Sequence, residues 1–290
     1  MIQPMVSVIV PTYRDQERLT KCVARLLAQS YETARLELIV VNNDPEERVV
    51  IEDSLQHDRV RVITEPIAGS YVARNRGAAI ARGDILVFTD SDCQPEPDWV
   101  MQLVRCFNET AADLVTGLVR MQTKEPKSVS AVEAYDMVTG IRQDVFAREQ
   151  RGATANLAVT RRQFDRVSGF DSARYSGGDM DFCRRVNKDG GGFAFCEHAV
   201  VLHPLRSEWR EVLNKARRLA GGKATVDRLE LKSSVPRMIA AQFTGFQLIW
   251  SASDLQFWQK IKAFGVFCVV KLVQVFEFLR VLLFRKKALR

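Results

Sequence analysis

The sequence predicts an α/β protein built on a mostly parallel β-sheet flanked by helices. Two observations indicate this fold class. In residues 1–100, short runs of β-branched and large apolar residues alternate with segments of helical spacing. Each strand-like run also ends in proline or polar residues. Such an alternation favours parallel strands joined by helices that cover both faces of the sheet.

The elements of this alternation follow one another closely. In the first predicted helix, apolar residues recur every three or four positions, so that one face is apolar. The second helix has a weaker pattern, and Gly83 is expected to cap the third at its C-terminal end. The predicted strands are residues 6–14, 36–44, 59–66 and 84–90, and the predicted helices are residues 14–29, 46–56 and 69–83.

The rest of the chain divides into two parts of different character. Residues 113–205 are less regular and contain a glycine-rich turn before a strand at residues 193–203. From residue 206 onward the chain consists of a basic helix and strongly apolar helices. We therefore expect one domain at residues 1–205 and a helical C-terminal region at residues 206–290.

The last apolar helix carries polar residues at every third position, namely Lys271, Gln274, Glu277 and Arg280, and then a basic tail. A membrane-spanning helix rarely tolerates so many polar groups. We expect an amphipathic helix that lies in an anionic membrane interface. A packing or dimer-forming helix of a soluble protein and a true membrane span remain alternatives.

Composition restricts the function only loosely. The 290 residues have a net charge of +7 and a pI of about 9.2, which suits an anionic partner. The basic residues are dispersed and lack interleaved aromatic residues, which argues against nucleic-acid binding. The six cysteines form no CxxC pair or zinc-finger spacing, so we expect reduced thiols in a cytosolic setting.

Two common nucleotide-binding motifs are absent from the sequence. No GxGxxG follows the first strand, and no GxxxxGK[ST] occurs anywhere. A dehydrogenase and a P-loop NTPase are therefore disfavoured. The N-terminal apolar run has no basic segment before it and meets Pro11, which predicts a strand and not a signal peptide.

Asp90 and Asp92 follow the apolar run at residues 85–88 directly. Two carboxylates at the end of a buried strand are unfavourable unless a positive charge joins them. Carboxylate oxygens suit Mn²⁺ or Mg²⁺, and such a cation bridges the phosphates of a nucleotide diphosphate. Because ligands bind at the carboxyl ends of parallel strands, polar residues after the other strands are expected at the same edge.

A second acidic pair, Asp179 and Asp181, follows two glycines. Acids in the first turn of a helix are explained by the helix dipole alone. The functional alternative is a general base at the N-terminus of that helix. His203 follows an apolar strand, and is either a structural histidine or a third metal ligand beside Asp90 and Asp92.

Six segments occur in a specific order, namely "VSVIVPTYR", "ELIVVNND", "GSYVARNRGAAIARGDILVFTDSDCQPEPDW", "GATANLAVTRRQFDRVSGFD", "GGDMDFCRRV" and "VLHP". Together they resemble the inverting nucleotide-sugar glycosyltransferases of family 2, which have the GT-A fold. The resemblance extends over residues 5–205 approximately. The ordered set is far more specific than any single motif in it.

The resemblance implies a role for several residues. Asp179 matches the catalytic base of the family, and the cation would be bound by Asp90, Asp92 and His203. The implied nucleotide-sugar contacts are Pro11, Thr12, Tyr13, Asn42, Arg74, Asn75, Asp90, Ser91 and Asn156.

The chain departs from the family pattern at two positions. Asn42-Asn43 stands where the family often has an acid that reads the base, which weakens the preference for uridine. UDP is still our first expectation for the donor, and GDP or dTDP are the alternatives. Gly178 stands where the family has a glutamate before the catalytic aspartate. The Gln-x-x-Arg-Trp element of processive synthases is also missing, which favours a hexosyltransferase that adds a single sugar.

The sequence thus predicts a metal-dependent, inverting glycosyltransferase at the cytoplasmic face of the cell membrane, attached as a peripheral or monotopic protein. Its acceptor would be a glycan or a lipid-linked glycan in cell-surface polysaccharide or glycolipid synthesis. A catalytically silent, membrane-bound partner in a glycan assembly complex is the alternative, and a homodimer is possible through the C-terminal helices. A nucleotidyltransferase is disfavoured because no glycine-rich loop follows the first strand.

Overall fold

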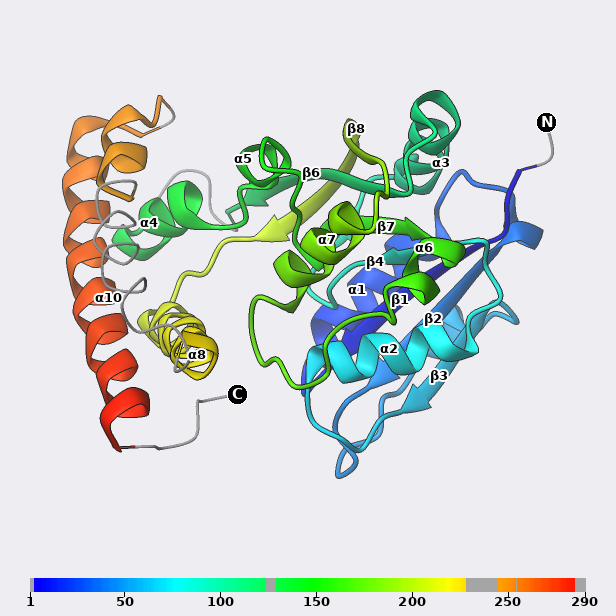
Figure 1. Ribbon diagram of the computed structural model, residues 1–290, viewed down its shortest axis with the longest axis horizontal. Helices are drawn as coiled ribbons and strands as arrows, with labels where there is room; N and C mark the ends of the chain where they lie inside the picture. The colour runs from blue at the N-terminus through cyan, green and yellow to red at the C-terminus, as the bar shows by residue number, and fades with distance from the viewer. Residues whose placement is uncertain (1–2, 124–128, 228–244, 254, 285–290) are drawn as a thin grey trace. The chain divides into compact units, whose positions relative to one another are not determined.

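The computed structural model describes residues 3–123, 129–227, 245–253 and 255–284 (Figure 1). The chain forms two compact units. Unit 1 consists of Met1–Arg120, Gln143–Arg174 and Gly178–His203, and unit 2 of Met121–Arg142, Tyr175–Gly177 and Pro204–Arg290. The C-terminal helices thus group with a segment from the middle of the chain.

Unit 1 is built around one sheet with the strand order β3-β2-β1-β4-β7-β6-β8-β5 (Figure 1). The strands β3, β2, β1 and β4 are parallel to one another, whereas β7 runs antiparallel to both β4 and β6. The predicted α/β fold is therefore confirmed. The strand bounds are β1 Val6–Thr12, β2 Leu36–Asn42, β3 Val60–Thr64, β4 Ile85–Phe88, β5 Gln94–Pro95, β6 Leu114–Gln122, β7 Leu157–Thr160 and β8 Phe193–Pro204.

Helices flank this sheet, and three of them contribute to one apolar core. Side chains of α2, α6 and α7 pack with strand residues such as Ile9, Leu86 and Phe88. The predicted first helix is confirmed as α1, which buries its apolar face. The helices of unit 1 are α1 Gln16–Leu27, α2 Ser70–Ile80, α3 Trp99–Thr110, α5 Gln143–Ala147, α6 Arg161–Arg166 and α7 Gly178–Lys188.

The helix expected at residues 46–56 is absent, and this prediction was wrong. The segment contains only a 3₁₀ turn at Asp53–Leu55. The Gln16 side chain bonds both backbone groups of Val50, accepting from its N–H at 3.0 Å and donating to its carbonyl at 2.7 Å. These bonds occupy the backbone groups of Val50 that a helix would use, and the β-branched residues of the segment have little helix propensity to oppose them.

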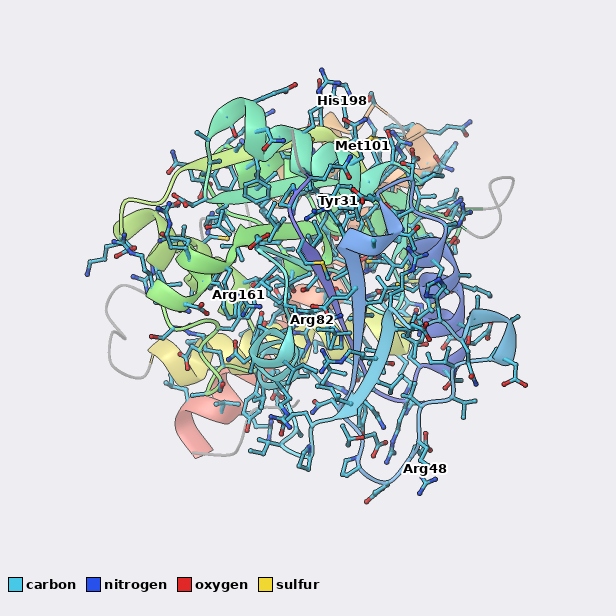
Figure 2. All side chains as sticks on the ribbon, turned by 90° about the vertical axis from the view of Figure 1, so that its right-hand side faces the viewer. Tyr31, Arg48, Arg82, Met101, Arg161 and His198 are labelled. Atoms are coloured by element: carbon cyan, nitrogen blue, oxygen red, sulfur yellow. The ribbon has the colours of Figure 1, made fainter. Side chains whose placement is uncertain are left out.

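The expected cap of α2 was also wrong. The helix ends at Ile80, and Arg161 donates to the carbonyl oxygens of Ala78 and Ala81 at 2.8 and 2.9 Å. Figure 2 labels Arg161 and also Arg82, the residue that follows Ala81. Gly83 instead allows a close approach to β1, because a Cβ there would lie 2.6 Å from the Ser7 backbone nitrogen.

Unit 2 is helical and has its own core. Its helices are α4 Ala131–Thr139, α8 Trp209–Asp227 and α10 Phe257–Phe284, and residues 245–251 are helical as well. Apolar side chains of α4, α8 and α10 pack together around residues such as Val138, Ala216 and Val266. No helix among the described residues is both long and apolar enough to cross a membrane.

The polar residues of α10 do not form an exposed stripe, contrary to the sequence interpretation. Glu277 is buried and bonds Arg280 within the helix. The exposed face is apolar instead, since Trp258, Leu272 and Phe276 are each 71% exposed. Apolar residues thus occupy both faces of this helix, the face that packs in unit 2 and the opposite face.

Two helical glycines provide the first testable prediction. A Cβ on Gly77 in α2 would lie 2.6 Å from Ile9 Cγ2, whereas a Cβ on Gly265 in α10 meets nothing within 4 Å. We expect Gly77→Ala to lower the free energy of unfolding by about 1–3 kcal/mol, because β1 cannot yield. Gly265→Ala should raise it by up to about 1 kcal/mol. Urea unfolding followed by circular dichroism measures both, and equal effects would contradict the described packing.

Candidate functional site

The parallel strands bring their carboxyl ends to one edge of the sheet. Thr12 pairs with Asn42, and Asn42 pairs with Thr64, so that β1, β2 and β3 end in register. The last residue of β4, Phe88, pairs with Ile9 on the other side of β1. The polar residues that follow these strands therefore lie along the same edge, as the sequence predicted.

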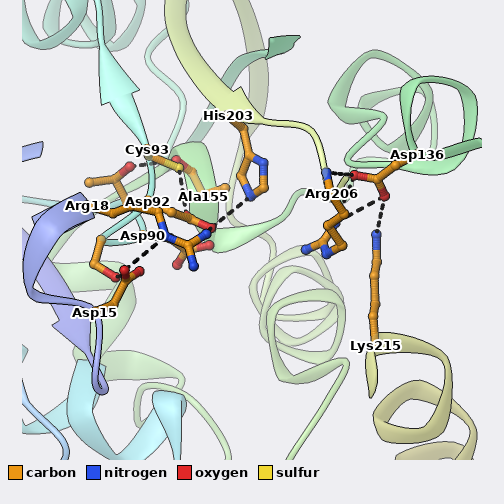
Figure 3. Close-up of polar contacts among 12 residues, drawn as sticks. Asp15, Arg18, Asp90, Asp92, Cys93, Asp136, Ala155, His203, Arg206 and Lys215 are labelled. Carbon is orange, nitrogen blue, oxygen red and sulfur yellow. Dashed lines mark hydrogen bonds and ion pairs between the residues drawn. The ribbon is translucent and has the colours of Figure 1, made fainter. Parts of the chain in front are cut away.

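Asp92 and His203 approach each other at this edge (Figure 3). The short strand β5 pairs antiparallel with β8, and this pairing brings the residues before β5 to the end of β8. Asp92 Oδ2 lies 3.6 Å from His203 Nε2. The Cys93 thiol completes a group whose ligand atoms lie within 4.8 Å of one another. The sequence interpretation missed Cys93, although it follows Asp92 directly.

The Cys93 thiol is fully buried, and burial raises its pKa well above the ordinary value, with the charge of Asp92 as the next cause. Sulfur is also a soft ligand, which suits a hard cation such as Mg²⁺ less well than carboxylate oxygen does. The guanidinium of Arg18 also lies near Asp92, at 3.9 Å from Oδ2. The carboxylate of Asp92 and the imidazole of His203 are the two strong ligand groups of this cluster.

Asp90 is placed differently from Asp92. Its carboxylate forms an ion pair with the guanidinium of Arg74, whose side chain is 4% exposed. Asp90 is not part of the described cluster of Asp92, Cys93 and His203. Arg74 Nε is buried without a hydrogen-bond partner among the described residues. The predicted role of Asp90 as a metal ligand stays a prediction, because in this structure Asp90 is bound to Arg74.

Asp179 lies in the first turn of α7, as predicted. Its Oδ1 accepts hydrogen bonds from the Tyr71 hydroxyl at 3.2 Å and from the Met180 N–H at 2.9 Å. Burial raises the pKa of Asp179, against the opposing effects of these two bonds and of the Arg74 charge. A carboxylate with a raised pKa is suited to accept a proton near neutral pH. Asp181, by contrast, is bound by three arginines and is structural.

Among the donor contacts predicted at the first two strands, some side chains are exposed and others are hydrogen-bonded within the protein. Tyr13 is 58% exposed, and Thr12 Oγ1 is buried without a partner among the described residues. Pro11 is part of β1, next to Val41 of β2. The side-chain N–H groups of Asn42 donate to the carbonyl oxygens of Asp44 and Glu47, so that its amide holds the loop after β2.

Three further residues that were predicted to contact the donor form hydrogen bonds within the protein in this structure. Ser91 Oγ donates to Asp15 at 3.4 Å. The Asn75 amide bonds both backbone groups of Phe170 at 2.7 and 2.9 Å. Asn156 is fully buried, accepts from Trp99 Nε1 at 2.9 Å, and donates to the carbonyl oxygens of Leu118 and Ala199. Donor contacts by Asn75 and Asn156 would require some of these bonds to open.

The fold and this site agree with a sequence match over more than half of the chain. Residues 7–168 match Glycosyl transferase family 2. The chain belongs to this family. The match includes the strand-end residues and the Asp-x-Asp of the site, and the resemblance drawn from the sequence motifs is thereby confirmed.

Individual relatives support the same assignment. The chain is 31% identical over 237 residues to glycosyltransferase AglE of Haloferax volcanii, a match that covers 79% of this chain and 77% of that one. It is 29% identical over 182 residues to the glucosyl-dolichyl phosphate glucuronosyltransferase of the same organism, covering 60% of this chain and 58% of the relative.

A solved structure has a similar fold. The mannosyltransferase PcManGT of Pyrobaculum calidifontis, solved with GDP-Man and Mn²⁺, superposes with a TM-score of 0.63. The superposition covers 99% of this chain and 89% of that one at 16% sequence identity. At this identity the likeness concerns the fold, which is that of a GT-A-like glycosyltransferase.

The buried amide of Asn156 leads to a second prediction. We expect Asn156→Ala to lower the free energy of unfolding by about 2–4 kcal/mol, because Trp99 Nε1 and two carbonyl oxygens lose their partner. The exposed Asn108 on α3 serves as a matched control, and Asn108→Ala should change the free energy by less than about 0.5 kcal/mol. Urea unfolding compares the two. Equal stabilities would show that this network contributes nothing.

Proposed function

We propose that this chain is a metal-dependent, inverting glycosyltransferase that transfers a single sugar from a nucleotide-diphosphate donor to a glycan or lipid-linked acceptor. One observation carries the proposal. The same edge of unit 1 holds a close pair of cation ligands, Asp92 and His203, and a separate carboxylate with a raised pKa, Asp179. Binding a cation and accepting a proton are two different tasks, and two sites are available for them.

The ligand atoms present fit a hard divalent cation. Two neighbouring ligands of octahedral Mg²⁺ or Mn²⁺ lie roughly 3 Å apart. Asp92 Oδ2 and His203 Nε2 are 3.6 Å apart. Mn²⁺ or Mg²⁺ held by these residues would supply positive charge against the leaving diphosphate. The relevance of Mn²⁺ is supported by its presence with GDP-Man in the similar mannosyltransferase.

The residues of the chain account for the remaining steps. Arg74 Nε and Thr12 Oγ1 are buried polar atoms without partners among the described residues, and both suit oxygens of the donor. Asp179 accepts the proton of the acceptor hydroxyl while that oxygen attacks the anomeric carbon from the face opposite the diphosphate. A single displacement of this kind inverts the configuration at the anomeric carbon.

The donor and the acceptor are proposed by class. UDP, GDP and dTDP sugars are the candidate donors, and GDP-Man gains support from the mannosyltransferase structure. A lipid-linked acceptor is supported by the relative named as a glucosyl-dolichyl phosphate glucuronosyltransferase. Cell-surface polysaccharide or glycolipid synthesis is the corresponding pathway. The sequence lacks the Gln-x-x-Arg-Trp element of processive synthases, which favours the addition of a single sugar.

We also propose that the C-terminal region, residues 206–290, binds the cytoplasmic face of the membrane peripherally. The exposed face of α10 includes Trp258, Ile261, Val269, Leu272, Phe276 and Leu279, which lie on one side at spacings of three, four and eight residues. Exposed apolar patches of this kind mark interaction sites. The excess of positive charge in the chain favours anionic lipid as the partner.

Calorimetry tests the donor site. We expect one of UDP, GDP and dTDP to bind in the presence of Mn²⁺, and EDTA to abolish this binding. Asp92→Ala should weaken it roughly tenfold or more, because a ligand of the cation is lost. The exposed Asp53 serves as a matched control, and Asp53→Ala should bind like the unaltered protein. If none of the three nucleotides binds in a metal-dependent way, the enzyme proposal fails and a silent partner becomes the better account.

Sedimentation with vesicles tests the membrane proposal. We expect the protein to bind vesicles of phosphatidylcholine and phosphatidylglycerol. The double variant Leu272→Glu, Phe276→Glu should bind them at least roughly tenfold more weakly. Met101→Glu, at an exposed apolar residue of α3, is the control and should bind normally. Unchanged binding by the double variant, with conversion of a dimer to a monomer in ultracentrifugation, would assign this face to a second copy of the chain.

A further inference from the structure

The ring of Tyr71 explains why residue 178 is a glycine. Gly178 is the first residue of α7 and stands directly before Asp179. A Cβ on Gly178 would lie 2.6, 2.8 and 2.9 Å from Cε2, Cδ2 and Cζ of Tyr71. Such distances are too short for any side chain. Tyr71 therefore occupies the space that an acid at position 178 would need.

The Tyr71 ring is held from several sides. It stacks against Phe170 with ring centroids 5.6 Å apart and an interplanar angle of 30°. The guanidinium of Arg74 lies 5.6 Å from the ring centroid. The residue is 6% exposed, so that its ring has little freedom to turn. Its hydroxyl is consequently fixed where it donates to Asp179 Oδ1.

The two oxygens of Asp179 have different surroundings. Oδ1 accepts the hydrogen bonds of the Tyr71 hydroxyl and the Met180 N–H. Over the residues that the structure describes, no hydrogen bond to Oδ2 is found. The carboxylate is thus anchored through one oxygen, and the other oxygen is available to accept a proton.

The charged and titratable groups near Asp179 are Tyr71, Arg74, Asp90 and Cys183. Burial and the charge of Asp90 raise the pKa of Asp179, whereas the Arg74 charge and the Tyr71 hydrogen bond lower it. Burial raises the pKa of Tyr71 far above neutral pH, and its hydroxyl therefore stays protonated and remains a donor.

We propose that Tyr71 is the positioning residue of Asp179, and that Gly178 is the substitution that admits it. The inference rests on the proposed role of Asp179 as the catalytic base. In this chain a neutral phenol fixes one oxygen of the base from α2, and its ring leaves no room for a side chain at position 178. The hydroxyl orients the base and favours its charged form without taking part in the proton transfer.

Tyr71→Phe tests the hydroxyl and leaves the ring in place. A donor to a carboxylate favours the charged form, so its removal raises the pKa of Asp179. We expect the Asp179 carboxyl carbon, assigned by its loss in Asp179→Asn, to titrate at higher pH in ¹³C spectra of aspartate-labelled Tyr71→Phe. Tyr31→Phe is the matched control, because the buried Tyr31 hydroxyl donates to Pro4 at 2.7 Å, and it should leave this titration unchanged.

Turnover gives a second readout with the donor that binds. Release of nucleoside diphosphate is measured in the presence of Mn²⁺, with a polyisoprenyl phosphate or water as acceptor. Tyr71→Phe should lower kcat roughly tenfold with little change in the KM of the donor. The acid limb of the kcat profile should move to higher pH, because the base is protonated at a higher pH. An unchanged titration and an unchanged profile in Tyr71→Phe overturn the inference.

The steric role of Gly178 is tested by substituting it in two backgrounds that differ at position 71. Gly178→Ala should lower the midpoint of thermal unfolding by several degrees, since the new Cβ meets the ring. In a Tyr71→Ala background the same change should have little effect or raise the midpoint, because alanine is the better helix residue. Equal effects in both backgrounds would overturn the steric part. Asp179→Asn distinguishes the role of Asp179 as the base from the role of Tyr71 in positioning it. If Asp179→Asn keeps full turnover, Asp179 is not the base, whatever the effect of Tyr71→Phe.

Discussion

The buried guanidinium of Arg74 is the charge on which the arrangement of the site depends. It pairs with Asp90 after β4, lies against the ring of Tyr71, and lowers the pKa of Asp179 on α7. Without this cation, the two carboxylates at a partly buried edge would repel each other, and the pKa of Asp179 would rise further. Because Arg74 belongs to α2, the helix that follows β3, the packing of α2 on β1 determines the position of the site's charges.

Much of this edge could be predicted from the sequence, because it depends on local pattern and on one general rule. Apolar runs identify β1, β2 and β4, and parallel strands present their carboxyl ends together. The convergence of Thr12, Asn42 and Asp90 at one edge follows from these two facts. Before the family resemblance, the sequence left His203 open between a structural role and a metal ligand, because its approach to Asp92 depends on β5, a strand of two residues that has no hydrophobic pattern of its own.

Other features depend on side chains that replace backbone partners, and no local pattern reveals them. Gln16 bonds both backbone groups of Val50, which takes them from the helix expected at residues 46–56. The amides of Asn75 and Asn156 are similar cases, because each bonds backbone groups far away in sequence. A sequence indicates that an asparagine is present near a site, but its partners are fixed only when distant strands and loops have come together.

The contact between Gly178 and Tyr71 also restricts the order in which this site can change. An acid can arrive at position 178 only after the ring at position 71 has become smaller, because the backbone of α7 leaves no room for both. The reverse path has the same restriction, since the phenol enters only once position 178 has lost its side chain. The tyrosine therefore requires the glycine, whereas the glycine can remain after the tyrosine is lost.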